Sequence, residues 1–218
     1  MTSFVTLALF SILLVSSCTE NTTTPVDSTI QTVTIGAQVW TTKNLDVSTY
    51  RNGDTIKFAS TPAEWQDATT KGEGAWCYFN NDPKNGEIYG KLYNWYAVND
   101  PRVLAPEGYH IPSGAEWYVL TKNLGGEQIA SFKMKSTTFW TNGGNGDNSS
   151  GYNGLPSGFC FSNGDFQGIG EIGNWWSSGI NVSFDKYSWI YYLHYDNSTT
   201  VNLKFNEGFG FSVRCIKD

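Results

Sequence analysis

Alternation of apolar and polar positions predicts β-strands at both ends of the chain. One alternating run covers residues 32–40. Three more runs, at residues 188–195, 201–206 and 209–216, are separated by Asp-Asn-Ser and Glu-Gly turn sequences. We therefore expect a first strand at residues 32–40 and a C-terminal antiparallel meander of three strands.

The last alternating run makes a specific prediction about a cysteine. Positions on the same face of a strand recur every second residue. One face carries the apolar side chains Phe209, Phe211, Val213 and Cys215, and the other carries Gly210, Ser212 and Arg214. We expect Cys215 to be buried.

Two helix starts interrupt the strand pattern. Residues 61–64 (TPAE) supply an N-cap, a first-turn proline and an acidic third position, which predicts a short helix to about Ala68. Residues 113–116 (SGAE) form a capping box before Trp117 and Leu120, and Gly125-Gly126 ends that helix. We expect it to be the longest helix.

Residues 141–158 are crowded with Gly, Asn, Asp and Ser, which predicts a long structured loop. Within it, Asp147 and Asn148 are candidate oxygen ligands for a structural Ca²⁺, although a solvated turn explains the same residues and no EF-hand spacing is present. We expect no other cofactor.

The N-terminal residues resemble a bacterial lipoprotein signal. An apolar run at residues 4–15 is too short to span a bilayer, and Ser16-Ser17-Cys18 follows it. We expect a signal peptide at residues 1–17, a lipid on Cys18 and a flexible tether at residues 18–32; an ordinary secretory signal is the alternative. Glu20 resembles a surface-export signal, or is a chance acid in a polar linker.

Composition limits the architecture and the partners. The remaining residues, about 190, fit one domain. Aromatic residues reach 16% and glycines number 23, which favours turns, short strands and aromatic packing over a helical bundle. The net charge of −6 opposes binding to nucleic acid and to anionic membrane surfaces.

Three cysteines remain besides Cys18, namely Cys77, Cys160 and Cys215, so at most one disulfide forms within the chain. No CxxC spacing is present, which argues against zinc-ribbon and thioredoxin-like sites. Cys215 has three alternatives: Cys77, Cys160 or no partner. We expect it to remain a buried thiol, with Cys77 and Cys160 unpaired as well.

Five motifs in order resemble the Fibrobacter succinogenes major paralogous domain. They are residues 35–45 (IGAQVWTTKNL), 89–98 (YGKLYNWYAV), 106–112 (PEGYHIP), 174–178 (NWWSS) and 210–215 (GFSVRC). The resemblance covers residues 33–218 and implies an exported protein, often a lipoprotein, with no activity to carry over. Family members commonly have a cysteine where this chain has Ala105.

A more distant similarity is to the formylglycine-generating and sulfatase-modifying group, through residues 173–176 and the last strand. That similarity implies a C-type-lectin-like fold. We therefore expect an irregular α+β domain with one main helix, long loops and a C-terminal antiparallel sheet.

Catalytic chemistry finds little support in the sequence. A copper or redox site at Cys215 needs a second thiolate nearby, and none is close in sequence. The two histidines, His110 and His194, fit structural roles. In an extended Trp175-Trp176 pair one ring points outward, so one of the two is a candidate platform for a sugar, but we favour core packing of both rings.

The sequence therefore predicts a non-enzymatic domain that a lipid anchors in the outer membrane. Both a cell-surface and a periplasmic location are compatible with the sequence. Its expected partners are the membrane, through the lipid, and a polysaccharide, a cell-wall or matrix component or a surface protein. A structural envelope protein without a small ligand is the alternative, and a formylglycine-generating-like enzyme is the distant one.

Overall fold

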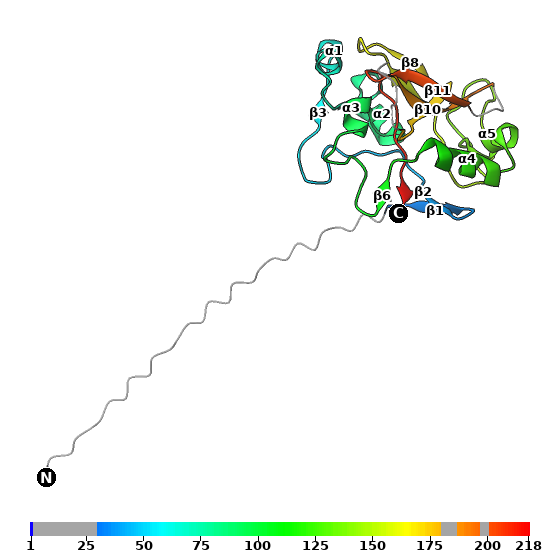
Figure 1. The fold of residues 1–218 in the computed structure, drawn as a ribbon, viewed down its shortest axis with the longest axis horizontal. Coiled ribbons are helices and arrows are strands. Elements are labelled where there is room, and N and C mark those ends of the chain that lie inside the picture. Colours follow the sequence, from blue (N-terminus) through cyan, green and yellow to red (C-terminus); the bar gives the residue numbers. More distant parts are fainter. Residues whose placement is uncertain (2–29, 180–186, 197–200) are drawn as a thin grey trace.

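The computed structural model describes residue 1 and residues 30–179, 187–196 and 201–218. The predicted signal peptide and Cys18 lie outside the described residues. The described chain is a mixed α+β domain of short helices and small sheets, as the sequence predicts (Figure 1). No helix in the described ranges is long and apolar enough to cross a membrane.

The helices are short and lie between strands. They are α1 (Pro62–Lys71), the 3-10 helix η1 (Phe79–Asn81), α2 (Pro83–Tyr89), α3 (Trp95–Val98), α4 (Gly114–Asn123) and α5 (Glu127–Met134). In Figure 1, α1, α2 and α3 lie to the left of strands β10 (Tyr187–His194) and β11 (Val201–Asn206), and α4 and α5 lie to the right.

The strands form small, separate sheets. The four-stranded sheet has the order β1 (Thr32–Ile35), β2 (Gln38–Thr41), β12 (Ile216–Lys217) and β6 (Tyr109–His110). One three-stranded sheet has the order β3 (Lys57–Phe58), β4 (Ala75–Cys77) and β5 (Leu92–Tyr93). A second three-stranded sheet has the order β11, β10 and β9 (Ile172–Trp176). A two-stranded sheet pairs β7 (Ser157–Cys160) with β8 (Phe166–Ile169).

The prediction of a single strand at residues 32–40 is wrong. The chain turns back at Gly36, whose φ is +63°, and β1 and β2 pair as an antiparallel hairpin in which Ile35 lies opposite Gln38. Glycine adopts this left-handed conformation without a Cβ penalty, so the alternation simply continues through a two-residue turn.

The C-terminal meander is confirmed for two of its three strands. β10 and β11 pair antiparallel, but the third strand of their sheet is β9. Residues 209–216 instead bridge to Cys160, Tyr93 and Trp175 before Ile216 enters β12. Alternation alone did not reveal this path, because both faces of the segment are buried and the segment connects several sheets.

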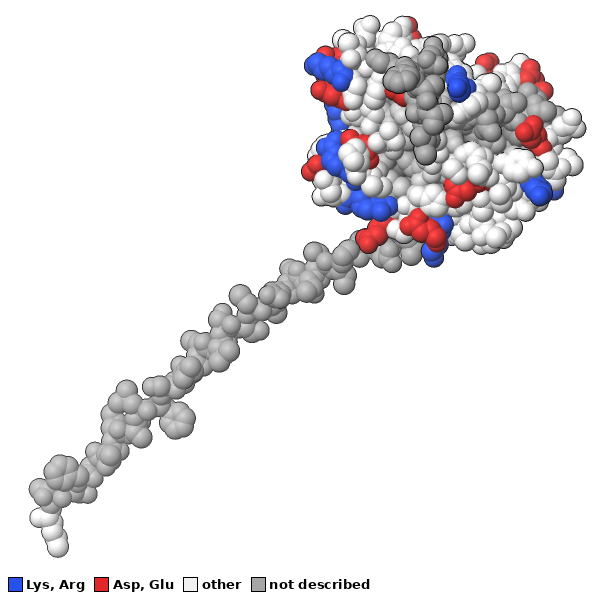
Figure 2. Space-filling model, viewed as in Figure 1, with Lys and Arg blue, Asp and Glu red and all other residues white. Residues whose placement is uncertain are grey.

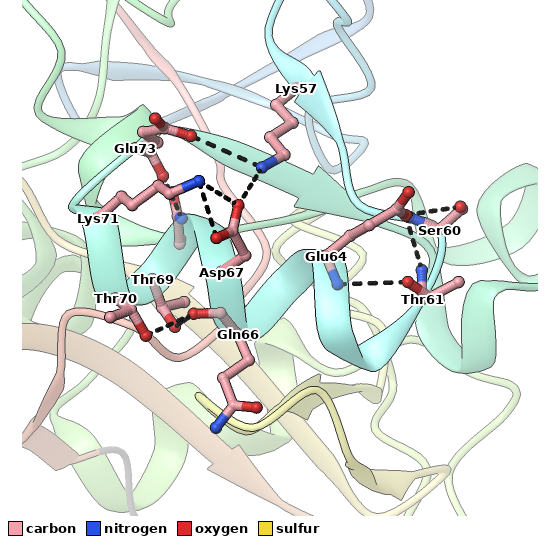
Figure 3. Close-up of polar contacts among 11 residues, drawn as sticks. Lys57, Ser60, Thr61, Glu64, Gln66, Asp67, Thr69, Thr70, Lys71 and Glu73 are labelled. Atoms are coloured by element: carbon pink, nitrogen blue, oxygen red, sulfur yellow. Dashed lines mark hydrogen bonds and ion pairs between the residues drawn. The ribbon is translucent and has the colours of Figure 1, made fainter.

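Both helix starts carry the predicted capping boxes. The Thr61 hydroxyl accepts from the Glu64 amide, and the Glu64 carboxylate accepts from the Thr61 amide (Figure 3). Pro62 lies in the first turn of this helix. Ser113 and Glu116 repeat the arrangement in α4. Helix α1 continues to Lys71, beyond the expected end near Ala68. Helices α1 and α4 both have 10 residues, so α4 is as long as α1, and not longer as the sequence had suggested.

The predicted long loop is confirmed from residue 141 to Pro156, and β7 begins at Ser157. The loop is anchored to the body: Gly154 donates to the Met134 carbonyl at 2.7 Å, and the Trp140 indole donates to the Gly154 carbonyl at 3.1 Å. Its conformation therefore depends on contacts outside the loop.

Aromatic side chains dominate the interior. Three buried clusters fill it, and the largest fully buried side chains include Trp40, Trp65, Trp117, Trp175 and Trp176. Their stacking explains how a chain with so little regular structure buries enough apolar area.

Candidate functional site

A pocket of about 440 Å³ lies where three parts of the chain meet. One wall comes from the chain after β2 and consists of Thr42, Lys43, Asn44 and Asp46, and residues 86–90 around the end of α2 form another. Thr138 and Phe139, just before the long loop, and Asn153 and Leu155 within it complete the lining. The volume falls within the roughly 300–1,000 Å³ that small-molecule sites occupy. This pocket is the candidate site.

Asn44 forms part of the pocket wall and is only 8% exposed. Its amide nitrogen donates to the Tyr89 carbonyl at 2.8 Å and to the Ser212 hydroxyl at 3.2 Å. Its oxygen accepts from Trp175 Nε1 at 2.8 Å and from Arg214 Nε at 2.7 Å. All four hydrogen-bonding positions of the side chain are used, so Asn44 shapes the pocket and does not contact a ligand through free polar atoms.

Arg214 lies behind Asn44 and is fully buried. Its guanidinium donates to the carbonyl oxygens of Thr41, Tyr152 and Asn153 at 2.7–2.8 Å and lies 4.5 Å from the centre of the Tyr152 ring. Burial lowers the pKa of Arg214. Its hydrogen-bond acceptors in the described part of the chain are neutral oxygens, which satisfy the donors of a desolvated charge and hold the pocket wall in place.

The rim of the pocket carries apolar side chains that face solvent. Phe139 is 49% exposed and Ile88 is 42% exposed. The Phe139 ring meets the Tyr89 ring edge to face, with centroids 5.9 Å apart. Phe139 also has a φ of +75°, a conformation that is costly for a bulky side chain. Such strain occurs most often at functional positions.

Charged side chains of both signs line the same pocket. Lys43, Asp46 and Glu87 are exposed there. The Asp46 carboxylate accepts from the buried Lys91 ammonium at 2.6 Å, whereas Lys43 and Glu87 form no ion pair within the described ranges. Figure 2 likewise shows basic side chains close to acidic ones, without a continuous basic stripe on the visible face. The mixed charge favours a neutral ligand over a polyanion.

The candidate sugar platform at Trp175 or Trp176 is wrong, and the favoured core packing is found instead, because both rings are fully buried. Trp175 donates to Asn44, and Trp176 donates to the Tyr93 carbonyl at 2.7 Å. The strand that carries them, β9, has buried layers on both faces, so alternation does not expose either ring. Neither indole is available to stack on a sugar.

The predicted cation ligands lie in the long loop, outside the pocket lining. The Asp147 carboxylate accepts from the Ser149 amide at 2.9 Å, and the Asn148 side chain accepts from the Asn153 amide at 2.8 Å. The described residues contain no group of three or more His, Cys, Asp or Glu side chains that could hold a metal. A structural Ca²⁺ at Asp147 and Asn148 stays a prediction.

The two histidines lie apart from the pocket. His110 on β6 contacts Asp218 through Nδ1 and Glu116 through Nε2, both at 2.7 Å. Burial by itself would lower the pKa of His110, but the two carboxylates outweigh it and raise the pKa. His194 contacts Asp196. Both rings therefore contact carboxylates, and the structural role expected from the sequence stays a prediction.

Sequence reasoning missed Asn44, Arg214 and Phe139. Asn44 and Arg214 fall within the motifs at residues 35–45 and 210–215, but neither motif indicates that the two side chains meet. Left-handed backbone is usually predicted from a glycine or an asparagine, and residue 139 is neither, so the positive φ of Phe139 could not be predicted from the sequence.

Comparison with known proteins gives one match. The sequence model of one protein family, the Fibrobacter succinogenes major domain, matches residues 33–217. No curated protein and no solved structure matches the chain. The similarity to the formylglycine-generating group therefore has no support from these comparisons, and the lectin-like fold stays a prediction. Because the match covers most of the 218 residues, the chain belongs to the Fibrobacter succinogenes major domain family.

Proposed function

We propose that the protein is an exported, lipid-anchored envelope domain that binds a neutral polysaccharide in the pocket beside residues 42–46. The observation that carries this proposal is Phe139, a half-exposed aromatic ring in a strained backbone conformation at the pocket rim. A fold that only needed to bury a hydrophobic side chain at this position would not have to hold it exposed and strained.

The lining has the chemistry that a sugar requires. The Phe139 ring and Ile88 offer apolar contact to the C–H face of a pyranose, which aromatic and aliphatic surfaces accept. Lys43 and Glu87 offer a donor and an acceptor for hydroxyl groups and are not committed to ion pairs within the described ranges. Apolar surface with a few placed polar groups is typical of ligand sites.

The anchor rests on the N-terminal sequence, where Ser16-Ser17-Cys18 follows the apolar run. Replacing Cys18 with serine should abolish incorporation of labelled fatty acid and release the protein from membranes. Fatty-acid incorporation that continues in Cys18→Ser would exclude this cysteine as the attachment site.

The environment of Cys215 supports a non-enzymatic role. Burial raises the pKa of the Cys215 thiol to about 12, so the reactive thiolate is scarce at neutral pH. Cys215 also belongs to a different buried cluster from Cys77 and Cys160. A pair of converging thiolates at Cys215, which a soft metal site needs, is absent from the described residues.

A glycan array tests the proposal. The full chain, purified in detergent, should bind a defined set of neutral polysaccharides, and Phe139→Ala should weaken that binding about fivefold, since an aromatic contact contributes on the order of 1 kcal/mol. Phe132→Ala is the matched control, because Phe132 is 53% exposed on α5 and does not line the pocket.

Two results would count against the site. Equal effects of the two substitutions would place the sugar elsewhere. No binding across a broad array would favour the alternative, a structural envelope protein without a small ligand.

A further inference from the structure

Two of the three described cysteines meet in the interior, although the sequence places them far apart. Cys77 ends β4 and Cys160 ends β7. Their side chains are 1% and 0% exposed and belong to one buried cluster, which also contains Trp65, Phe79 and Leu92. Both are free thiols in the structure; burial raises the pKa of the Cys77 thiol, and Cys160 is close enough to Cys77 to raise it further. Cys215 lies in another cluster.

A close approach of two chain segments produces this meeting. The chain leaves β4 and forms η1, which packs against β7 through Phe79. At Gly158, in β7, a Cβ atom would lie only 2.6 Å from the Phe79 ring, and Gly158 has a φ of +63°. A glycine at this position therefore lets β7 pack closely against η1, which follows Cys77 directly, and this packing brings Cys160 into the same buried cluster as Cys77.

We propose that Cys77 and Cys160 form a disulfide when the chain folds in an oxidising compartment, while Cys215 remains a thiol. In the structure all three cysteines are free thiols, as the sequence predicts, and the proposal adds that Cys77 and Cys160 pair on oxidation. Its relevance in the cell rests on the proposed export, but the chemistry can be tested in the purified protein without it. Exported proteins meet oxidants that cytosolic proteins do not.

The bond forms by thiol–disulfide exchange with a small disulfide such as oxidised glutathione. One cysteine thiolate attacks a glutathione sulfur and releases one glutathione; the second cysteine then attacks the mixed disulfide and releases another. The two cysteine sulfurs lose two electrons to the glutathione disulfide, and the two thiol protons end on the two released glutathione molecules.

The timing follows from burial. Desolvation, together with the contact to Cys160, raises the pKa of the Cys77 thiol, so the folded protein offers little thiolate for exchange. The bridge therefore forms while the chain is folding and both sulfurs are still accessible. Once formed, it links the sheet of β3, β4 and β5 to the β7–β8 hairpin.

The test is a disulfide map of the full chain in detergent. Fully reduced, unfolded protein is refolded with reduced and oxidised glutathione, and remaining thiols are alkylated in denaturant before digestion and mass spectrometry. We expect one cross-linked peptide pair containing Cys77 and Cys160, and an alkylated Cys215. Cys215→Ala should give the same cross-link, and Cys77→Ser should leave Cys160 without it.

Thermal unfolding gives an independent measurement. The bridged protein should melt roughly 5–10 °C above its reduced form in the wild type and in Cys215→Ala, but not in Cys77→Ser, because the cross-link restricts a long loop of the unfolded chain. Alkylation of both Cys77 and Cys160 in refolded protein, or a bridge that contains Cys215, would overturn the proposal. An identical melting temperature with and without reduction would overturn it as well.

Discussion

Arg214 and Asn44 lie 170 positions apart in the sequence, yet the Arg214 Nε donates to the Asn44 side-chain oxygen at 2.7 Å in the buried wall of the pocket. This contact joins the C-terminal segment to the chain that follows β2. It also carries a full positive charge into the interior, where the carbonyl oxygens of Thr41, Tyr152 and Asn153 accept from three of its other four N–H donors.

We expect replacement of Arg214 to destabilise the fold strongly. Arg214→Met would leave the carbonyl oxygens of Thr41, Tyr152 and Asn153 without their donor, at a cost of about 3–5 kcal/mol in the free energy of unfolding. Arg214→Lys should recover only part of the loss, because an ammonium group cannot reproduce the planar fork of donors. Urea unfolding followed by tryptophan fluorescence measures both variants.

Arg51 supplies a matched control for this prediction. It also donates to backbone carbonyls, those of Ala105, Pro106 and Tyr109, but it is exposed. Water can replace the lost donors there, so Arg51→Met should cost roughly 1 kcal/mol. Equal losses for the two methionine variants would contradict the importance that we give to burial.

The backbone of Phe139 should reverse the usual order of alanine and glycine. At a φ of +75°, Phe139→Gly should be more stable than Phe139→Ala by about 1 kcal/mol, since glycine adopts this conformation without strain. Phe132 lies inside α5, so Phe132→Gly should instead be less stable than Phe132→Ala by about 1 kcal/mol. The same order at both positions, measured by urea unfolding, would show that residue 139 is not strained.

His110 should make stability depend on pH. Its pKa is raised in the folded protein, so its contribution is fully present below the unfolded value of about 6.5 and is lost as the pH rises through the folded pKa. The His110 side chain is 41% exposed, and solvent screening limits the effect to under about 1 kcal/mol. We expect His110→Gln to lose more stability at pH 5.5 than at pH 8.5.

Asp218→Asn checks that the carboxylate is the cause, because it removes one of the two charged partners of His110 and should reduce the same pH dependence. Thermal unfolding of the wild type and both variants across this range gives the measurement. A constant difference between the wild type and His110→Gln at both pH values would refute the prediction.

Cys215 should react only when the protein unfolds. The thiol is 1% exposed, and burial raises its pKa to about 12. At pH 8 we expect iodoacetamide to alkylate Cys215 at least about a hundredfold more slowly in the native protein than in denaturant, since both access and the thiolate fraction fall. Peptide mass spectrometry resolves Cys215 from the other cysteines, and comparable rates in the two states would show that the segment around Cys215 is accessible.

Several features could be predicted from the sequence because they depend on neighbouring residues. The capping boxes at Thr61 and Ser113 act within one turn of helix, so the pattern of residue types was enough to place both helix starts. The burial of Cys215 followed from alternation, and the ordered motifs indicated the family that the comparison confirms.

Other features depend on contacts between distant parts of the chain. Trp175 and Trp176 alternate along β9, but neighbouring layers cover both faces of that strand, so both rings are buried. Arg214 looks like an outward-facing charge until the oxygens of Asn44, Thr41, Tyr152 and Asn153 surround it. Local pattern determines where a helix begins or which residues alternate, whereas burial and pairing depend on which segments pack together, and only the tertiary structure decides that.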